Sequence, residues 1–449
     1  MKKAIPILWV TFLLFASGTT ILSQPGKIAF TEFDLKNGLH VILHQNNSVP
    51  IVAINVMYHV GSKNEKADRT GFAHFFEHLM FEGSENIGRG EYFKYVQKAG
   101  GENNANTSFD RTDYFEVLPS NQLVLGLWLE SERMLHLKID SVGIETQRKV
   151  VKEERRQTYE NQPYGRLESE IFAAAYKVLP YRWLPIGEDQ YIDQAKHNEF
   201  MDFYKEFYVP ENAVLVIAGD IQIENTKAIV KKYYEGIPAG KKPIYRPTEK
   251  EPPQTKETRT TAYDKVQLPA VVYAYHIPAV GTPDSYAMDM LQKYLTGGES
   301  SQFYKSLVDQ QQLALQVEAI PLSLEDDGLF IIFGITNIGK TAEELDKAMD
   351  IEITKAKTEA MSDSSFLKIE NQIENDFYSQ NSTMRGIAQN LAEYYTYLKD
   401  PNLINSEIEK YKKITKADLL RVANQYLKSA NRVVLYYLPE SLKNKEAKP

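Results

Sequence analysis

The chain carries two weakly similar copies of one pattern, and this repetition constrains its fold more than any other feature. The segment Ile54 to His59 (INVMYH) resembles Val271 to His276 (VVYAYH), which begins 217 positions later. The segment that starts at Asn212 (NAVLVIA) resembles the one that starts at Asn431 (NRVVLYYL), 219 positions later. Two matches at nearly one separation indicate a duplicated α+β domain; two unrelated strands of common composition are the alternative.

Strand and helix patterns alternate within the first copy. β-Branched and apolar runs predict strands, among them one strand over 107–117. Apolar residues at helical spacing predict helices, among them a long charged helix over 143–160. We expect two structurally related α+β domains, each a mainly antiparallel sheet with helices packed on it. Together they would form a half-clamp around a cavity.

Composition shifts divide the chain. Segment 238–260 is rich in Pro, Lys, Glu and Thr without an apolar period, so we interpret it as a linker between domains at 24–237 and 261–449. Residues 1–23 show the order of a secretory signal peptide: two lysines, an apolar run, then small polar residues. The apolar run is too short for a comfortable membrane span, so membrane anchoring is the weaker interpretation. We expect an exported protein, either periplasmic or secreted.

Charge and cysteine content limit the available chemistry. The formal net charge of the 449 residues is -8, and no basic run is long enough to suggest a nucleic-acid groove, so nucleic acid is not an expected partner. The chain has no cysteine, which excludes disulfides, thiolate metal ligands and cysteine nucleophiles. Any metal ion must therefore be held by nitrogen and oxygen.

The segment His74-Phe-Phe-Glu-His78 combines two imidazoles and a carboxylate. Four residues turn a helix by about 400°, so both rings leave one face and can share a metal ion. Glu77 projects from nearly that face, where it can take a proton from the metal's water, and H-x-x-E-H is a zinc-peptidase motif. Ordinary surface residues are the alternative. The apolar flanks argue against it, because they predict a buried helix whose ionisable groups need a partner.

A third protein ligand should come from elsewhere, because a catalytic zinc keeps three protein ligands and one open position. In the predicted helix 143–160, Glu153 and Glu154 point about 100° apart, so only one of them can face the metal. Glu154 shares a stripe with Val150 and Val151, which favours it. From the residues alone, a solvated ion-pair face is the stronger interpretation of this segment.

The corresponding part of the second copy lacks the motif. Met288 to Leu295 and the GGESS segment after it contain no histidine and no paired carboxylates. We therefore expect the first half to carry the chemistry and the second to shape the cavity, since binding sites commonly lie between two domains.

Several segments together resemble the pitrilysin/insulinase metallopeptidase family. They are the H-x-x-E-H motif, Gly100 to Ala105 (GGENNA), Thr107 to Tyr114 (TSFDRTDY), Arg148 to Glu154 (RKVVKEE) and, in the second half, Leu295 to Tyr304 (LTGGESSQFY). The nearest type is the short two-domain bacterial peptidase similar to the mitochondrial processing peptidase catalytic subunit. The likeness covers nearly the whole chain after the predicted signal peptide.

The resemblance implies roles for the residues of the motif. His74 and His78 would be zinc ligands and Glu77 the general base. The family's third zinc ligand lies at a distance from the second histidine that position 154 matches, and Glu153 is the alternative. The family often has a supporting glutamate seven residues before that ligand, where this chain has Gln147.

The resemblance also implies a substrate site. Asn104 and Ala105 match the edge strand on which the family lays its substrate, so that an extended peptide pairs with free backbone groups. From the residues alone, a turn before a hairpin strand is an equal alternative. An arginine and a tyrosine of the second half would hold the scissile carbonyl. Arg385 with Tyr394 or Tyr395 are the candidates, but their spacing departs from the expected seven residues.

These features predict a zinc-dependent endopeptidase with one Zn²⁺ per chain, acting on peptides or unfolded polypeptides in an enclosed chamber. Two alternatives stay open: a non-catalytic or partner-dependent subunit of a heterodimeric peptidase, and a zinc hydrolase acting on something other than peptides. We expect a homodimer or a heterodimer with a paralogous subunit.

Overall fold

The computed structural model describes residues 26–446. The predicted signal peptide, residues 1–23, lies outside this range. Among the described residues, no helix is long and apolar enough to span a bilayer.

The first half is built on a six-stranded sheet with the order β1-β2-β6-β3-β5-β4. Neighbouring strands are antiparallel, except that β2 and β6 run parallel. The strands are β1 (Thr31–Asp34), β2 (His40–Gln45), β3 (Ile51–Tyr58), β4 (Glu102–Thr107), β5 (Thr112–Pro119) and β6 (Ala213–Gly219). Strand β4 is the last strand at its end of the sheet, so one of its backbone edges has no strand partner among the described residues.

The second half repeats this sheet without a counterpart of β1. Its order is β7-β11-β8-β10-β9, and β7 and β11 form the parallel pair. The strands are β7 (Thr258–Asp264), β8 (Ala270–Ile277), β9 (Ala314–Leu322), β10 (Gly328–Thr336) and β11 (Arg432–Pro439).

Strand register shows the duplication residue by residue. Tyr58 of β3 pairs with Ala213 of β6, and Tyr275 of β8 pairs with Arg432 of β11. Tyr275 follows Tyr58 by 217 positions, and Arg432 follows Ala213 by 219 positions, as in the sequence repeat. Two related α+β domains with mainly antiparallel sheets are therefore confirmed.

The helices follow each sheet in corresponding order. The first half has α1 (Phe72–Leu79), α2 (Tyr92–Lys98), α3 (Leu123–His136), α4 (Ser141–Arg155), α5 (Leu167–Ala175), α6 (Asp189–Gln194), α7 (His197–Phe207) and α8 (Ile223–Tyr234). The second half has α9 (Pro283–Thr296), α10 (Ala342–Thr358), α11 (Asp363–Gln380), α12 (Met384–Leu398), α13 (Leu403–Ser406), α14 (Ile408–Tyr411), α15 (Lys416–Tyr426) and α16 (Glu440–Glu446).

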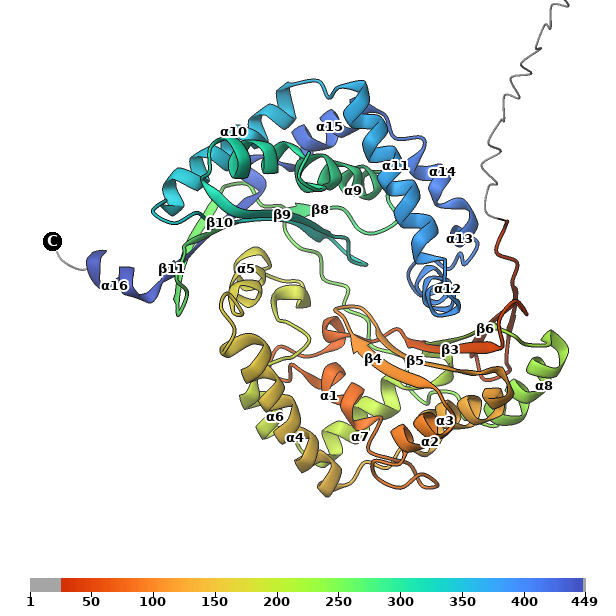
Figure 1. Ribbon diagram of the computed structural model, residues 1–449. Coiled ribbons are helices and arrows are strands. Elements are labelled where there is room, and N and C mark those ends of the chain that lie inside the picture. Colours follow the sequence, from red (N-terminus) through yellow and green to blue (C-terminus); the bar gives the residue numbers. More distant parts are fainter. Residues whose placement is uncertain (1–25, 447–449) are drawn as a thin grey trace, which may run out of the picture.

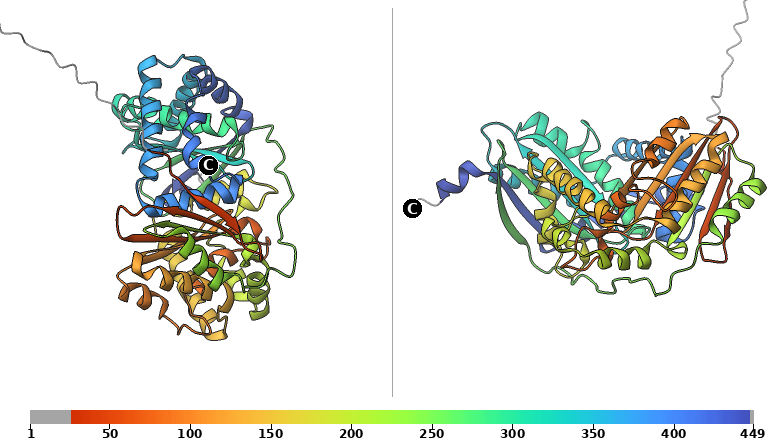
Figure 2. Two further views of the ribbon diagram at one scale, coloured as in Figure 1. Left: turned by 90° about the vertical axis from the view of Figure 1, so that its right-hand side faces the viewer. Right: turned by 90° about the horizontal axis from the view of Figure 1, so that it is seen from below.

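The two sheets face each other, with most helices on their outer sides and α5 and α12 between them (Figures 1 and 2). The halves exchange these two helices: α5 packs against β7, β8 and β11 of the second sheet, and α12 packs against β3 and β6 of the first. Leu167 and Met384, which begin α5 and α12, are again 217 positions apart. The exchange buries an apolar layer formed by Ile42, Ala53, Met57, Val214 and Val216 against Met384, Ile387, Ala388 and Leu391.

Two boundaries differ from the sequence prediction. The strand predicted over 107–117 is a hairpin of β4 and β5, because the chain turns back where Ser108 N–H donates to Arg111 C=O at 2.8 Å. Phe109 in that turn is buried, and its ring stacks on Phe172 with the ring centres 5.0 Å apart. The turn therefore contains a core residue, and its sequence resembles that of a strand. The predicted linker 238–260 has no helix or strand until β7 begins at Thr258.

Candidate metal centre

Helix α1, which carries the motif, is fixed by aromatic packing on its inner face. Phe72 and Phe75 stack on Phe200 of α7 with ring centres 4.9 and 4.8 Å apart. Phe76 stacks on Phe203 at 5.3 Å. The apolar residues of the motif therefore bury one side of the helix and turn the two histidines and Glu77 to the other.

The start of α1 is held by a carboxylate that the sequence did not indicate. Glu65 is buried, and its two oxygens accept the backbone N–H groups of Gly71 and Ala73 at 2.9 and 2.8 Å. Burial raises the pKa of Glu65 to about 8 against the opposing effect of these hydrogen bonds. Gly71 has φ of 90°, a left-handed conformation that favours glycine, and a Cβ there would meet Ile186 O at 3.0 Å. Glu65 and Gly71 thus set where the helix begins, at Phe72, two residues before His74.

Three side chains converge between α1 and α4. His74 Nε2 lies 3.5 Å from Glu154 Oε1, and His78 Nε2 lies 3.1 Å from Glu154 Oε2. The ligand atoms of the three residues all lie within 4.8 Å of one another, and these residues form the one such group of His, Asp and Glu among the described residues. Two ligands bound to zinc at about 2.1 Å and at a tetrahedral angle are about 3.4 Å apart. The two histidine–carboxylate separations lie close to that edge, so the donor set fits a zinc ion.

The charges at this centre favour a cation. Hydrogen bonds from His74 and His78 hold the pKa of Glu154 well below its usual range, against the effect of burial. Burial alone would lower the pKa of His78, but the neighbouring Glu154 carboxylate outweighs it and the pKa rises. The carboxylate therefore stays ionised and attracts positive charge at the point where both imidazoles are aimed.

Helix α4 shows which of the two neighbouring glutamates faces the centre. Glu153 is half-exposed and interacts with Arg156 at 2.9 Å and Gln157 at 3.0 Å, so it belongs to the ion-pair face that the sequence suggested. Glu154 points to the histidines. About two turns before Glu154, Gln147 Nε2 donates to Glu82 Oε1 at 2.5 Å. Gln147 also contributes to the raised pKa of His78. Gln147 therefore lies beside the centre.

Glu77 lies next to the histidines without joining the group. Its Oε2 accepts a hydrogen bond from Thr107 Oγ1 at 2.6 Å. Thr107 is the last residue of β4, and the sequence gave no reason to single it out. The contact spans 30 positions and depends on α1 lying across β4, which no local pattern indicates.

Asn104 and Ala105 lie in the middle of edge strand β4, opposite Phe115 and Tyr114 of β5. Ala105 N–H donates to the side chain of Asn104, with Oδ1 at 2.9 Å. A side-chain oxygen therefore occupies the position where the carbonyl of an added strand would bind.

The structure brings one of the two predicted carbonyl-binding partners close to this strand. The Arg385 guanidinium lies 3.7 Å from the ring centre of Phe115, the residue paired with Asn104. Tyr394 instead donates its hydroxyl to Glu407. Tyr395 stacks on His40, with ring centres 3.6 Å apart. Both tyrosines thus have partners other than Arg385.

Comparisons with known proteins find relatives over most of the chain. The family model described as insulinase (peptidase family M16) matches residues 40–182, and the model described as the peptidase M16 inactive domain matches residues 194–373. A zinc protease of Helicobacter pylori, PqqE, is 31% identical over 430 residues, covering 95% of this chain and 97% of its own. A probable mitochondrial-processing peptidase subunit beta of Arabidopsis thaliana is 23% identical, covering 92% of this chain and 78% of its own.

Solved structures show the same architecture. The crystal structure of a protease from Helicobacter pylori superposes with a TM-score of 0.87 at 31% identity, covering 91% of this chain and 99% of that one. The first half of the periplasmic protease PqqL from Escherichia coli has the same fold, with a TM-score of 0.75 at 17% identity and 95% coverage of both chains. The chain therefore belongs to the insulinase family of peptidases, M16.

Proposed function

We propose that this protein is a zinc-dependent endopeptidase. The observation that carries the proposal is the convergence of His74, His78 and Glu154, whose ligand atoms lie within 4.8 Å of one another, with Glu77 beside them. Zinc bound there would supply a Lewis acid that acidifies water and polarises a peptide carbonyl.

Glu77 would act as general base and then as general acid. Its carboxylate takes the proton of the attacking water and delivers it to the leaving nitrogen as the peptide bond breaks. Because Thr107 occupies one carboxylate oxygen, the other is available for the proton. His74, His78 and Glu154 serve as ligands only.

The substrate would be an extended peptide added to β4. Backbone pairing at an edge strand depends little on sequence, which suits unfolded polypeptides and peptides. Asn104 would release Ala105 N–H when the substrate carbonyl takes its place. A cavity of about 530 Å³ is lined by Arg155 and Tyr159 of the first half and by Asp264 of the second.

A partner-dependent subunit is the second candidate function. The observation that favours it is the engagement of Tyr394 with Glu407, which leaves Arg385 without the predicted tyrosine. The carbonyl contact would then come from another chain of the same family. Activity that requires a co-purified paralogue would favour this candidate over a self-sufficient enzyme or homodimer.

The test compares two adjacent glutamates. Glu154→Gln should lose stoichiometric zinc, measured by plasma mass spectrometry, and lose cleavage of an unfolded fluorogenic peptide. Glu153→Gln is the matched control, because Glu153 faces the exposed side of α4. Glu77→Gln should keep zinc and lose cleavage. Undiminished cleavage by Glu77→Gln would overturn the proposal.

A further inference from the structure

The Glu77 carboxylate has one hydrogen-bond partner among the described residues, and it comes from strand β4. Thr107 Oγ1 lies 2.6 Å from Glu77 Oε2. An ionised carboxylate only accepts hydrogen bonds, so the threonine hydroxyl donates. A short bond to a charged acceptor is of the stronger kind, and it fixes one oxygen of a side chain that otherwise has three rotatable bonds.

The position of Thr107 on β4 explains how the hydroxyl reaches the base. Successive side chains of a strand alternate between its two faces, so Ala105 and Thr107 share one face and Asn104 lies on the other. Ala105 is buried in the apolar core that includes Phe75 and Phe76 of α1. The strand therefore directs Thr107 toward α1 while its free edge stays open to a peptide.

We infer that Thr107 is a positioning residue that orients the Glu77 carboxylate relative to a peptide held on β4. The inference rests on the proposed function and adds a residue to it. One strand carries both the backbone groups that hold the peptide and the hydroxyl that holds the base. The distance between the scissile bond and the proton acceptor is then set within β4 and not by the rotamer of Glu77 alone.

A purely structural role makes a different prediction. If the hydroxyl only ties β4 to α1, its loss should weaken the fold or shift the strand, and substrate binding should suffer. If it orients the base, its loss should slow turnover while the peptide still binds. The two roles therefore separate in the steady-state constants.

The experiment uses the full chain with zinc bound and an unfolded fluorogenic peptide. Thr107→Val keeps the shape and removes the donor, whereas Thr107→Ser keeps the donor. We expect Thr107→Val to lower kcat about 10-fold to 100-fold, the range for a lost hydrogen bond to a charged group, with KM within about twofold of the wild type. Thr107→Ser should restore most of kcat. Thr146→Val is the control, because Thr146 on α4 is exposed and bonds only its own helix at Val142 C=O.

Each outcome decides the inference. The inference is overturned if kcat is unchanged in Thr107→Val. It is also overturned if only KM rises and Thr107→Ser does not reverse that rise. A loss of zinc or of thermal stability in Thr107→Val that Thr107→Ser shares also overturns it. If Glu77→Gln is inactive while Thr107→Val is fully active, the proposed function stands and this inference fails. If Glu77→Gln is active, the proposed function itself fails.

Discussion

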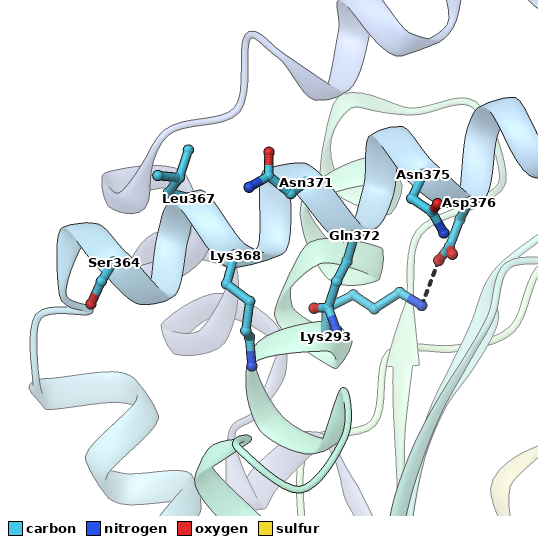
Figure 3. A pocket seen from close by; sticks show the side chains of 8 residues that line it. All are labelled: Lys293, Ser364, Leu367, Lys368, Asn371, Gln372, Asn375 and Asp376. Carbon is cyan, nitrogen blue, oxygen red and sulfur yellow. Dashed lines mark ion pairs between the residues drawn. The ribbon is translucent and has the colours of Figure 1, made fainter.

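Lys293 Nζ lies 2.8 Å from Asp376 Oδ2, and this ion pair occupies in the second half the place that His78 and Glu154 occupy in the first. Figure 3 shows the pair between α9 and α11. In the first half the corresponding helices, α1 and α4, bring His78 Nε2 to 3.1 Å from Glu154 Oε2.

Backbone landmarks establish the correspondence. Gly83 and Gly298 both have left-handed φ, 114° and 94°, and His78 and Lys293 each stand five residues before them. By the same count His74 corresponds to Asp289 and Glu77 to Gln292.

The second helix of each pair has its own landmark. Asp140 caps α4 by accepting Gly143 N–H at 2.8 Å, and Ser362 caps α11 by accepting Ser365 N–H at 3.1 Å. Glu154 and Asp376 each follow their cap by fourteen residues. The second half therefore keeps the frame of the metal centre, with an ammonium group supplying the positive charge.

The retained frame predicts that a second zinc site can be installed. The triple variant Asp289→His, Lys293→His and Asp376→Glu should raise zinc from one to two per chain. In a Glu154→Gln background it should restore one zinc without cleavage, because Gln292 stands where Glu77 does. A folded triple variant that gains no zinc would show that the two frames differ in geometry. Single Lys293→His is the control, since one imidazole cannot form a three-ligand site.

Lys63 joins the two halves through ion pairs that should contribute to the stability of the protein. Its buried ammonium lies 2.8 Å from Glu325 and 2.7 Å from Asp326, both in the turn between β9 and β10, and 3.6 Å from Asp110. Lys63→Met should destabilise the protein by about 3–5 kcal/mol, because it leaves the buried Asp110 carboxylate without its cation. Glu325 and Asp326 keep His59 and Lys250 as partners. Thermal or urea unfolding measures this.

The control for Lys63 is a surface lysine. Lys36 is 88% exposed and lies 3.8 Å from Glu235, so Lys36→Met should change stability by less than about 0.5 kcal/mol. Equal effects of the two substitutions would refute the assigned role of Lys63.

The raised pKa of Asp113 should make the stability of the protein depend on pH. This buried carboxyl of β5 accepts a hydrogen bond from Asn55 at 2.8 Å, and burial raises its pKa to about 7. A pKa above the unfolded value of 3.8 means that the folded state binds the proton more tightly. The stabilisation is therefore fully present below about pH 4 and is lost as pH rises through about 7.

Asp113→Asn removes this titration and keeps an acceptor for Asn55. The variant should be more stable than the wild type at pH 8, by on the order of 2 kcal/mol, and its advantage should disappear toward pH 4. Urea unfolding between pH 4 and pH 8 measures the slope. Parallel curves for the two proteins would show that Asp113 does not titrate in this range.

The sequence predicted the parts of the site that depend on local periodicity. The four-residue step of His74 and His78 is present in α1. Of the stripe that favoured Glu154 over Glu153, Val151 is buried as expected and Val150 is exposed. The repeat separation predicted two related α+β domains. These features follow from helix and strand geometry and need no knowledge of long-range packing.

Long-range contacts were the part that could not be predicted. Thr107 meets Glu77, and Lys63 meets Glu325 at a separation of 262 positions, only because whole elements pack together. Glu65 caps α1 from outside the helix, across a loop with no capping pattern. The prediction of a single strand over 107–117 was wrong for the same reason. Phe109 lies in a turn but is buried in the core, so its apolar side chain fitted the pattern of a strand.

Edge-strand binding predicts that the backbone of the substrate matters more than its side chains. Ala105 N–H is free for an added strand once Asn104 Oδ1 is displaced. A peptide whose backbone N–H groups are methylated one at a time should show KM raised about 10-fold at every second position, because alternate groups of a strand face its partner. Side-chain changes at the same positions should have smaller effects. A uniform response along the peptide, or none, would show that the substrate is held by pockets and not by pairing with β4.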